Sequence, residues 1–122
     1  MYSELTLEHF QNPQNVGKLE NADAIGMVGD PSCGDTLMMF IKVDGEIISD
    51  IKYLVFGCAG SIATSSMAST MIKGQSIEKV LQLKDQDVVD ALGGLPADKE
   101  HCSNLGIQAV HAAIRNYREQ QS

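Results

Sequence analysis

The residues that decide the fold are 36–56, TLMMFIKVDGEIISDIKYLVF. In the first half, every second residue is apolar, and one face of a strand would carry Leu37, Met39, Ile41 and Val43, with Lys42 on the other. Asp44-Gly45 follows, the strongest short-range hairpin signal. A return strand from about Ile47 to Phe56 then places Ile51, Tyr53 and Val55 on a common face. The stretch therefore predicts two antiparallel strands joined by a tight turn.

A further strand and several helices are predicted around this hairpin. Residues Ala24 to Val28 predict a short strand that makes the hairpin a three-stranded meander. The predicted helices are a short N-terminal one stopped by Asn12-Pro13, a small-residue one from just after Cys58 to Lys73 that Gly74 ends, one from Ser76 to Leu83, one from Asp85 or Asp87 to Leu92, and one from about Cys102 to Glu119. The pattern predicts an α+β fold in which a three-stranded antiparallel sheet packs against about five helices.

Length and composition narrow the class of protein. The 122 residues, 13.2 kDa, predict a single domain over residues 1–122 that buries a core without disulfides. A formal charge of −7 disfavours nucleic acid as a partner. No apolar run approaches the roughly 18 residues of a membrane span, and no secretory signal opens the sequence. Three cysteines cannot all pair, so we expect a reducing compartment, the cytoplasm.

Three cysteines carry the functional signal. Cys33, Cys58 and Cys102 each lie at the boundary of a predicted element, so we expect them to converge at one end of the sheet, near the start of the last helix. Asp35 and His101 stand within two residues of the first and third cysteine. Three thiols with a carboxylate and an imidazole suit a thiophilic metal. The set is one thiolate short of a permanent zinc or iron–sulfur site. A buried structural role is the usual reading of one free cysteine, but it is the weaker reading of three in such surroundings.

The remaining histidines and methionines are interpreted as structural. His9 lies on the N-terminal helix and His111 on the last helix, and neither has a cysteine beside it. The Met38-Met39 pair is expected to fill the core. Known zinc and redox signatures are absent, including Cys-x-x-Cys, His-Glu-x-x-His and the deaminase pattern. The cysteines therefore fit no pattern that spacing alone identifies.

Several motifs in order resemble the IscU/NifU-type iron–sulfur cluster assembly scaffolds. They are His9 to Gly17 (HFQNPQNVG), Cys33-Gly34-Asp35, Tyr53 to Ser66 with Phe56-Gly57-Cys58, Leu92 to Pro96 (LGGLP), and Lys99 to Ser103 (KEHCS). The match covers nearly the whole chain, and the LGGLP stretch is closer to the N-terminal domain of NifU than to a typical IscU. The resemblance implies a stand-alone scaffold with the IscU/NifU N-terminal fold, which is not an enzyme.

The resemblance also implies a mechanism and a ligand set. Iron and sulfur would be assembled transiently into a [2Fe–2S] cluster on Cys33, Cys58 and Cys102, while Asp35 and His101 compete for the remaining position. Replacing one thiolate by a harder ligand leaves the cluster exchangeable. Sulfur would arrive as a persulfide on Cys102, whose place at a helix start beside His101 and Lys99 favours the thiolate.

The implied partners are a PLP-dependent cysteine desulfurase, a ferredoxin-type reductant and acceptor apoproteins. The sequence Leu95-Pro96-Ala97-Asp98-Lys99 departs from the Leu-Pro-Pro-Val-Lys that a dedicated DnaK-like chaperone reads, so that partner stays open, as does a homodimer. Zinc could occupy the site of the apo protein. The SufU relatives, zinc-dependent sulfurtransferases and persulfide carriers, also resemble this chain, but they usually carry an insertion between the second and third cysteines.

Two other classes remain as alternatives. The first is a sulfurtransferase or thiol hydrolase with Cys102 as nucleophile and His101 as base, which requires two adjacent side chains to meet and leaves the other cysteines unexplained. The second is a structural zinc module, whose tight site would be needed for folding. Reconstitution with iron and sulfide discriminates among the three.

Overall fold

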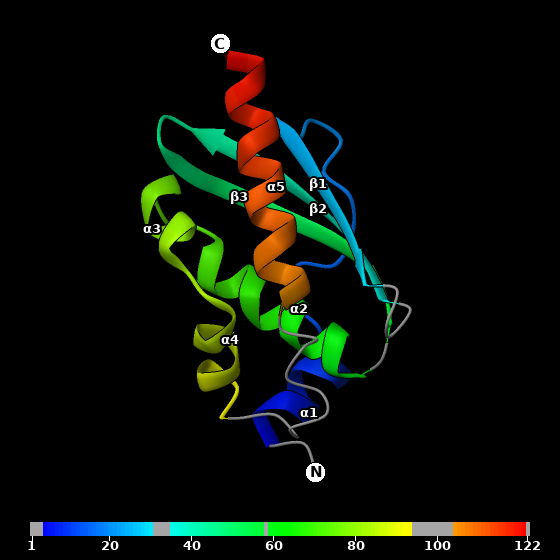
Figure 1. Cartoon of the computed structure of the whole chain (residues 1–122). Helices are drawn as coiled ribbons and strands as arrows, with labels where there is room; N and C mark the ends of the chain where they lie inside the picture. Colours follow the sequence, from blue (N-terminus) through cyan, green and yellow to red (C-terminus); the bar gives the residue numbers. More distant parts are fainter. Residues whose placement is uncertain (1–3, 31–34, 58, 94–103, 122) are drawn as a thin grey trace.

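The computed structural model describes residues 4–30, 35–57, 59–93 and 104–121 (Figure 1). Its elements are α1 (Glu4–Gln11), β1 (Ala24–Asp30), β2 (Asp35–Asp44), β3 (Ile47–Phe56), α2 (Ala59–Ile72), α3 (Ile77–Gln82), α4 (Asp85–Ala91) and α5 (Asn104–Gln121). These elements confirm the predicted α+β fold, since the described part of the chain holds one three-stranded antiparallel sheet and five helices. The predicted start of the last helix, about Cys102, lies outside the described residues.

The sheet is the predicted meander, in the order β1-β2-β3. Gly45, in the turn between β2 and β3, has φ 66°, which glycine adopts without steric cost. The pairing of β2 with β3 shifts between Lys42 and Val43, an irregularity that the alternating pattern did not predict. Such a bulge inserts one residue and increases the local twist. The apolar face of β2 still points toward the core beyond this irregularity, because Val43 packs against the core.

Short signals in the sequence begin and end the helices. The Ser76 side chain accepts a hydrogen bond from the Lys79 backbone N–H at 3.2 Å, which confirms the predicted N-cap of α3. Helix α4 begins at Asp85, which was one of the two predicted starts. Gly74 after α2 and Gly93 after α4 have φ 84° and 81°, the left-handed conformation that commonly follows a helix.

The helices cover one face of the sheet. Helix α5 crosses β1 and β2, while α2 packs against β3 and against α5 (Figure 1). The predicted faces of β2 and β3 meet these helices, because Leu37, Met39, Ile41, Ile51 and Tyr53 are all fully buried. The core continues into α5 through Ile107, Val110 and Ile114. Met39 fills the core as expected, whereas Met38 on the other face is half-buried.

One glycine sets how closely α5 approaches the sheet. A Cβ built on Gly26 of β1 would lie 2.1 Å from the Ala109 carbonyl oxygen and 2.5 Å from the Ala113 nitrogen. Strand and helix backbones are therefore in direct contact, with alanines on the facing side of the helix. Only glycine permits this approach.

The outer edge of β3 is covered at two places. Residue 16 forms a parallel bridge with Tyr53, and Ile47 bridges Ser76 near the start of the strand. The Gly74 N–H donates to the Ile48 carbonyl at 2.7 Å, and the Ile48 N–H donates to the Gln75 carbonyl at 2.9 Å. Covering an edge strand in this way satisfies its backbone groups and protects it from pairing with another chain.

Candidate functional site

Four of the five predicted ligands, Cys33, Cys58, His101 and Cys102, lie outside the described residues. For the fifth ligand, Asp35, the structure describes the backbone. Asp35 is the first residue of β2 and pairs with Asp30. The ligand set therefore stays a prediction. What the structure does place is the set of elements that lead into each of these segments.

The sheet gathers two of the three cysteine segments at one end. Asp30, the last residue of β1, pairs with Asp35, and Thr36 pairs with Phe56, the last residue of β3. The segment with Cys33 joins β1 to β2, and Cys58 stands between Phe56 and the start of α2. Because the meander is antiparallel and its pairing is regular at this end, both segments start from the same end of the sheet.

Helix α5 brings the third segment toward this end. Its Asn116 Nδ2 donates to the Ile25 carbonyl at 2.7 Å, and its Glu119 lines a surface hollow of about 520 Å³ together with Ala22, just before β1. The C-terminal half of α5 therefore lies beside the beginning of β1. The first turn of α5 consequently points to the opposite end, where β1 finishes (Figure 1).

Helix α2, which follows the second cysteine, packs against the first turn of α5, which follows the segment with the third cysteine. A Cβ on Gly106, in the first turn of α5, would lie 3.0 Å from the Ala68 Cβ of α2, and the Thr64 carbonyl oxygen is 3.9 Å away. The small residues of α2 are what allow this approach. Five of its six hydroxyl-bearing residues are fully buried, namely Ser61, Thr64, Ser65, Ser66 and Ser69, while Thr70 is exposed. Of the two roles that small side chains could have here, close packing or room for a cofactor, the described contacts show the first.

The two histidines that were interpreted as structural do make structural contacts. His9 Nδ1 lies 2.6 Å from the Ser66 Oγ, and His111 Nε2 lies 3.2 Å from the Val80 carbonyl oxygen. Within residues 4–30, 35–57, 59–93 and 104–121, no group of three His, Cys, Asp or Glu side chains could hold a metal ion.

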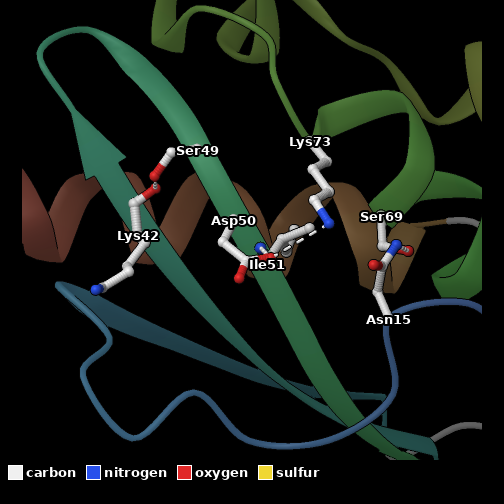
Figure 2. Close-up of polar contacts among 7 residues, drawn as sticks. All are labelled: Asn15, Lys42, Ser49, Asp50, Ile51, Ser69 and Lys73. Carbon is white, nitrogen blue, oxygen red and sulfur yellow. Dashed lines mark hydrogen bonds and ion pairs between the residues drawn. The ribbon is translucent and has the colours of Figure 1, made fainter.

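Residues 4–17, called here the N-terminal segment, make contacts that sequence reasoning missed. Asn15 Nδ2 donates to the Ser69 Oγ of α2 at 2.9 Å (Figure 2). One signal was available, since Asn is one of the few residues other than Gly that adopt positive φ, and Asn15 has φ 64°. The partner on α2 could not be found from local sequence, because it is 54 residues away.

Tyr53 lies where the N-terminal segment meets β3. Its side chain is fully buried, and no hydrogen bond of good geometry reaches its hydroxyl from the described residues. Burial raises the pKa of Tyr53 to about 12, and the nearby Ser66 hydroxyl acts weakly in the opposite direction. The phenol therefore stays neutral throughout the physiological pH range.

An exposed ion pair joins β3 to the residue that follows α2. Lys73 Nζ is 3.6 Å from Asp50 Oδ1, and both side chains are more than a third exposed (Figure 2). A pair of this kind contributes little to stability in water, because solvent screens it. The attachment of α2 to the sheet therefore depends on packing and hydrogen bonds.

Known proteins similar to this chain include iron–sulfur cluster assembly scaffold proteins. The family model of the NifU-like N terminal domain matches residues 1–122. Over 117 residues the chain is 54% identical to the "Iron-sulfur cluster assembly scaffold protein IscU 1" of Archaeoglobus fulgidus, which covers 96% of this chain and 76% of that protein. The protein of the same description from Aquifex aeolicus is 47% identical over 118 residues, with 95% and 75% covered.

A solved structure agrees in fold. The crystal structure of the N-terminal part of a NifU-like protein from Brucella abortus superposes with a TM-score of 0.78 at 21% identity, and covers 97% of this chain and 94% of that one. At this identity the likeness shows the fold alone.

Among the described helices, none combines the length and the apolar character needed to cross a membrane.

Proposed function

The chain belongs to the family of the NifU-like N terminal domain and is an iron–sulfur cluster assembly scaffold, not a catalytic enzyme, and on this premise we propose how its own residues hold and release the cluster. Residues 1–122 act as one scaffold domain. The thiolates of Cys33, Cys58 and Cys102 bind the iron, and Asp35 or His101 takes the remaining position. The observation that supports this set is the convergence of the described flanking elements at one end of the sheet.

The donor set explains why the cluster can be given away. The cargo is a [2Fe–2S] cluster, for which four thiolates make a durable site. A carboxylate or an imidazole in one position is a harder ligand than a thiolate and binds iron of the cluster less firmly. An acceptor thiol can therefore displace that ligand first.

Sulfur reaches the cluster through Cys102. The Cys102 thiolate attacks the outer sulfur of a desulfurase persulfide, so that a new S–S bond forms on Cys102 and the desulfurase thiolate leaves. Two electrons from a ferredoxin-type reductant then cleave this bond, which yields sulfide for the cluster and regenerates the Cys102 thiolate. A helix start favours the thiolate form that this attack requires.

The scaffold works with the iron–sulfur assembly machinery. Within it we assign a cysteine desulfurase as sulfur donor, a ferredoxin-type reductant, and apoproteins as acceptors. Free thiols are needed for each step, and we therefore place the protein in the reducing cytoplasm. Zinc can take the same thiolates when iron is absent, which would be occupancy of the site and not a second function.

Anaerobic reconstitution tests the assignment. The protein is incubated with ferrous iron, cysteine, a desulfurase and dithiothreitol as the electron donor, and the visible spectrum is followed before and after an apo-ferredoxin is added. We expect charge-transfer bands that pass to the acceptor, and no sulfur transfer for Cys102→Ser. Colourless, tight zinc binding needed for folding, or sulfur turnover without iron, would overturn the proposal.

Asp35 is tested separately. We expect Asp35→Ala to permit assembly but to slow transfer, since removing an oxygen ligand also removes the position at which an incoming thiolate displaces it. Transfer half-lives at matched cluster loading give the measurement. An unchanged or shorter half-life would return Asp35 to a structural role at the start of β2.

A further inference from the structure

None of the large apolar side chains of α1, in the N-terminal segment, is fully buried. In α1 the large apolar residues Leu5, Leu7 and Phe10 are 37%, 41% and 40% exposed, and the buried residue is Thr6. These large apolar residues of α1 thus do not form its buried face. Hydrophobic burial alone is a weak attachment for so short a helix. Polar contacts to α2 and β3 must contribute to its position.

The first polar contact joins the end of α1 to the middle of α2. The fully buried Ser66 Oγ accepts a hydrogen bond from the Gln14 backbone N–H at 2.8 Å and lies 2.6 Å from His9 Nδ1. Because this hydroxyl already accepts from Gln14, its own proton is free to go to a neutral His9 nitrogen. Ser66 therefore holds both sides of the turn that follows α1.

The second contact is one turn further along α2. Asn15 Nδ2 donates to the Ser69 Oγ at 2.9 Å (Figure 2). The Ser69 hydroxyl in turn donates to the Ser66 carbonyl oxygen at 2.7 Å. The two serines are thus linked, and consecutive hydrogen bonds of this kind strengthen each other in a buried setting.

The third contact ties the segment to the sheet. The Gly17 N–H donates to the Tyr53 carbonyl at 2.9 Å, and the Tyr53 N–H donates to the Asn15 carbonyl at 3.1 Å. One stretch of backbone therefore reaches α2 through the Asn15 side chain and β3 through the main chain of the same residue. It bridges the helix and the edge strand that stand on either side of Cys58.

The face of α2 toward α5 is packed as well. Gly106 of α5 approaches Ala68, while Ser66 and Ser69 receive the N-terminal segment. Helix α2 therefore lies between α5 and the N-terminal segment. Its first residue, Ala59, directly follows Cys58.

We propose that His9 and Asn15 are positioning residues for the cluster, because through Ser66 and Ser69 they hold α2, and with it Cys58, in place between β3 and α5. The inference rests on the proposed role of Cys58 as a ligand. Metal ligands function only when their supporting contacts hold them within a fraction of an ångström. Loosening α2 should therefore alter the cluster without removing any ligand.

The test uses the whole chain with Ser66→Ala and, in case that variant folds poorly, His9→Ala, which leaves α2 unchanged. We expect amide hydrogen exchange of residues 61–66 to rise by about tenfold in either variant. The reconstituted cluster should show an altered visible circular dichroism spectrum and a half-life shorter by about tenfold. His9→Asn should restore both, since its amide can offer an acceptor near the position of Nδ1.

Two controls separate positioning from a general loss of stability. Thr70→Ala removes a hydroxyl of the same helix that donates within α2, to the Met67 carbonyl at 2.7 Å. Ser76→Ala removes the N-cap of α3, away from the N-terminal segment, and so destabilises the protein by another route. Both should leave the cluster spectrum and half-life unchanged.

Three results would overturn the inference. The first is unchanged exchange in α2 when Ser66 or His9 is replaced. The second is faster exchange with an unchanged cluster spectrum and half-life, and the third is an equal effect of Ser76→Ala on the cluster. If the wild type builds no cluster, the proposed function fails, and the exchange rates alone then decide whether the N-terminal segment holds α2.

Discussion

Helix α5 contacts β1 backbone to backbone, whereas the N-terminal segment contacts α2 and β3 through individual hydrogen bonds. The first contact is apolar, continuous with the core and built from Gly26 against alanines. The second leaves large apolar side chains of α1 partly in solvent. A closely packed contact is destabilised by small changes in side-chain volume. A hydrogen bond within the protein replaces one to water, so each contributes only about 1 kcal/mol to the free energy of unfolding. The two regions should therefore respond to mutation by different amounts.

Gly26→Ala should have the largest effect. The added Cβ would lie 2.1 Å from a main-chain oxygen, and neither backbone can yield without moving α5 off the sheet. We expect a loss of more than about 4 kcal/mol in the free energy of unfolding, measured by urea denaturation.

The control for this change is Gly45→Ala in the turn between β2 and β3. A Cβ there meets nothing within 4 Å, and φ of 66° alone opposes the substitution. It should cost about 1–2 kcal/mol. An equal cost at both positions would show that α5 yields to the added Cβ, and that its close contact does not make Gly26 necessary.

Alkaline pH should weaken the region around Tyr53 next. The pKa of this phenol rises from 10 in the unfolded chain to about 12 in the folded protein, because burial opposes the phenolate. Its stabilising contribution is complete below pH 10 and is lost as the pH rises through 12. Two pKa units correspond to about 2–3 kcal/mol of unfolding free energy.

The measurement is the urea midpoint of wild type and Tyr53→Phe between pH 7 and the onset of alkaline unfolding. Since the hydroxyl lacks a partner of good geometry among the described residues, its removal should be nearly neutral at pH 7. The urea midpoint of Tyr53→Phe should then fall less steeply above pH 10 than that of the wild type. Parallel curves would contradict the assignment of the alkaline loss to Tyr53.

Gly106→Ala should give the smallest effect of the three. Its Cβ would lie 3.0 Å from the Ala68 Cβ, so the two helices must separate by a few tenths of an ångström. Alanine gains helix propensity at the same time, which offsets part of the cost. We expect a net loss of about 1 kcal/mol, because α5 is held by β1 and α2 by the N-terminal segment.

A double-mutant cycle with Ala68→Gly sharpens this prediction. Removing the facing methyl group should recover the loss, with a coupling energy of about 1 kcal/mol between the two positions. Additive effects would mean that α2 and α5 adjust freely, and that the packing of α2 is not fixed on this side.

Much of the fold followed from local sequence. Alternation from residue 36 to 56 and Asp44-Gly45 predicted both strands and their turn, because side chains on a strand have a period of two and the turn requires positive φ. Ser76, Gly74 and Gly93 marked helix ends through their own backbone preferences. The order of motifs led to the family, which the matches to known proteins then confirmed.

The candidate site divides in the same way. Residue chemistry alone selected Cys33, Asp35, Cys58, His101 and Cys102, and these ligands remain a prediction. The positions of the three cysteines at the boundaries of predicted elements predicted convergence at one end of the sheet, but not which strands and helices bring the segments there. That arrangement depends on strand register and on the direction in which α5 crosses β1.

The sequence by itself determined the element types and the turn residues, since each depends on residues a few positions apart. Only the tertiary structure decided that Gly26 admits α5 and that Asn15 reaches Ser69. Those pairs are separated by dozens of residues, and their contacts exist only once the sheet and helices have packed. Local preferences cannot encode such distances, because they act through neighbours in the chain, whereas packing acts through neighbours in space.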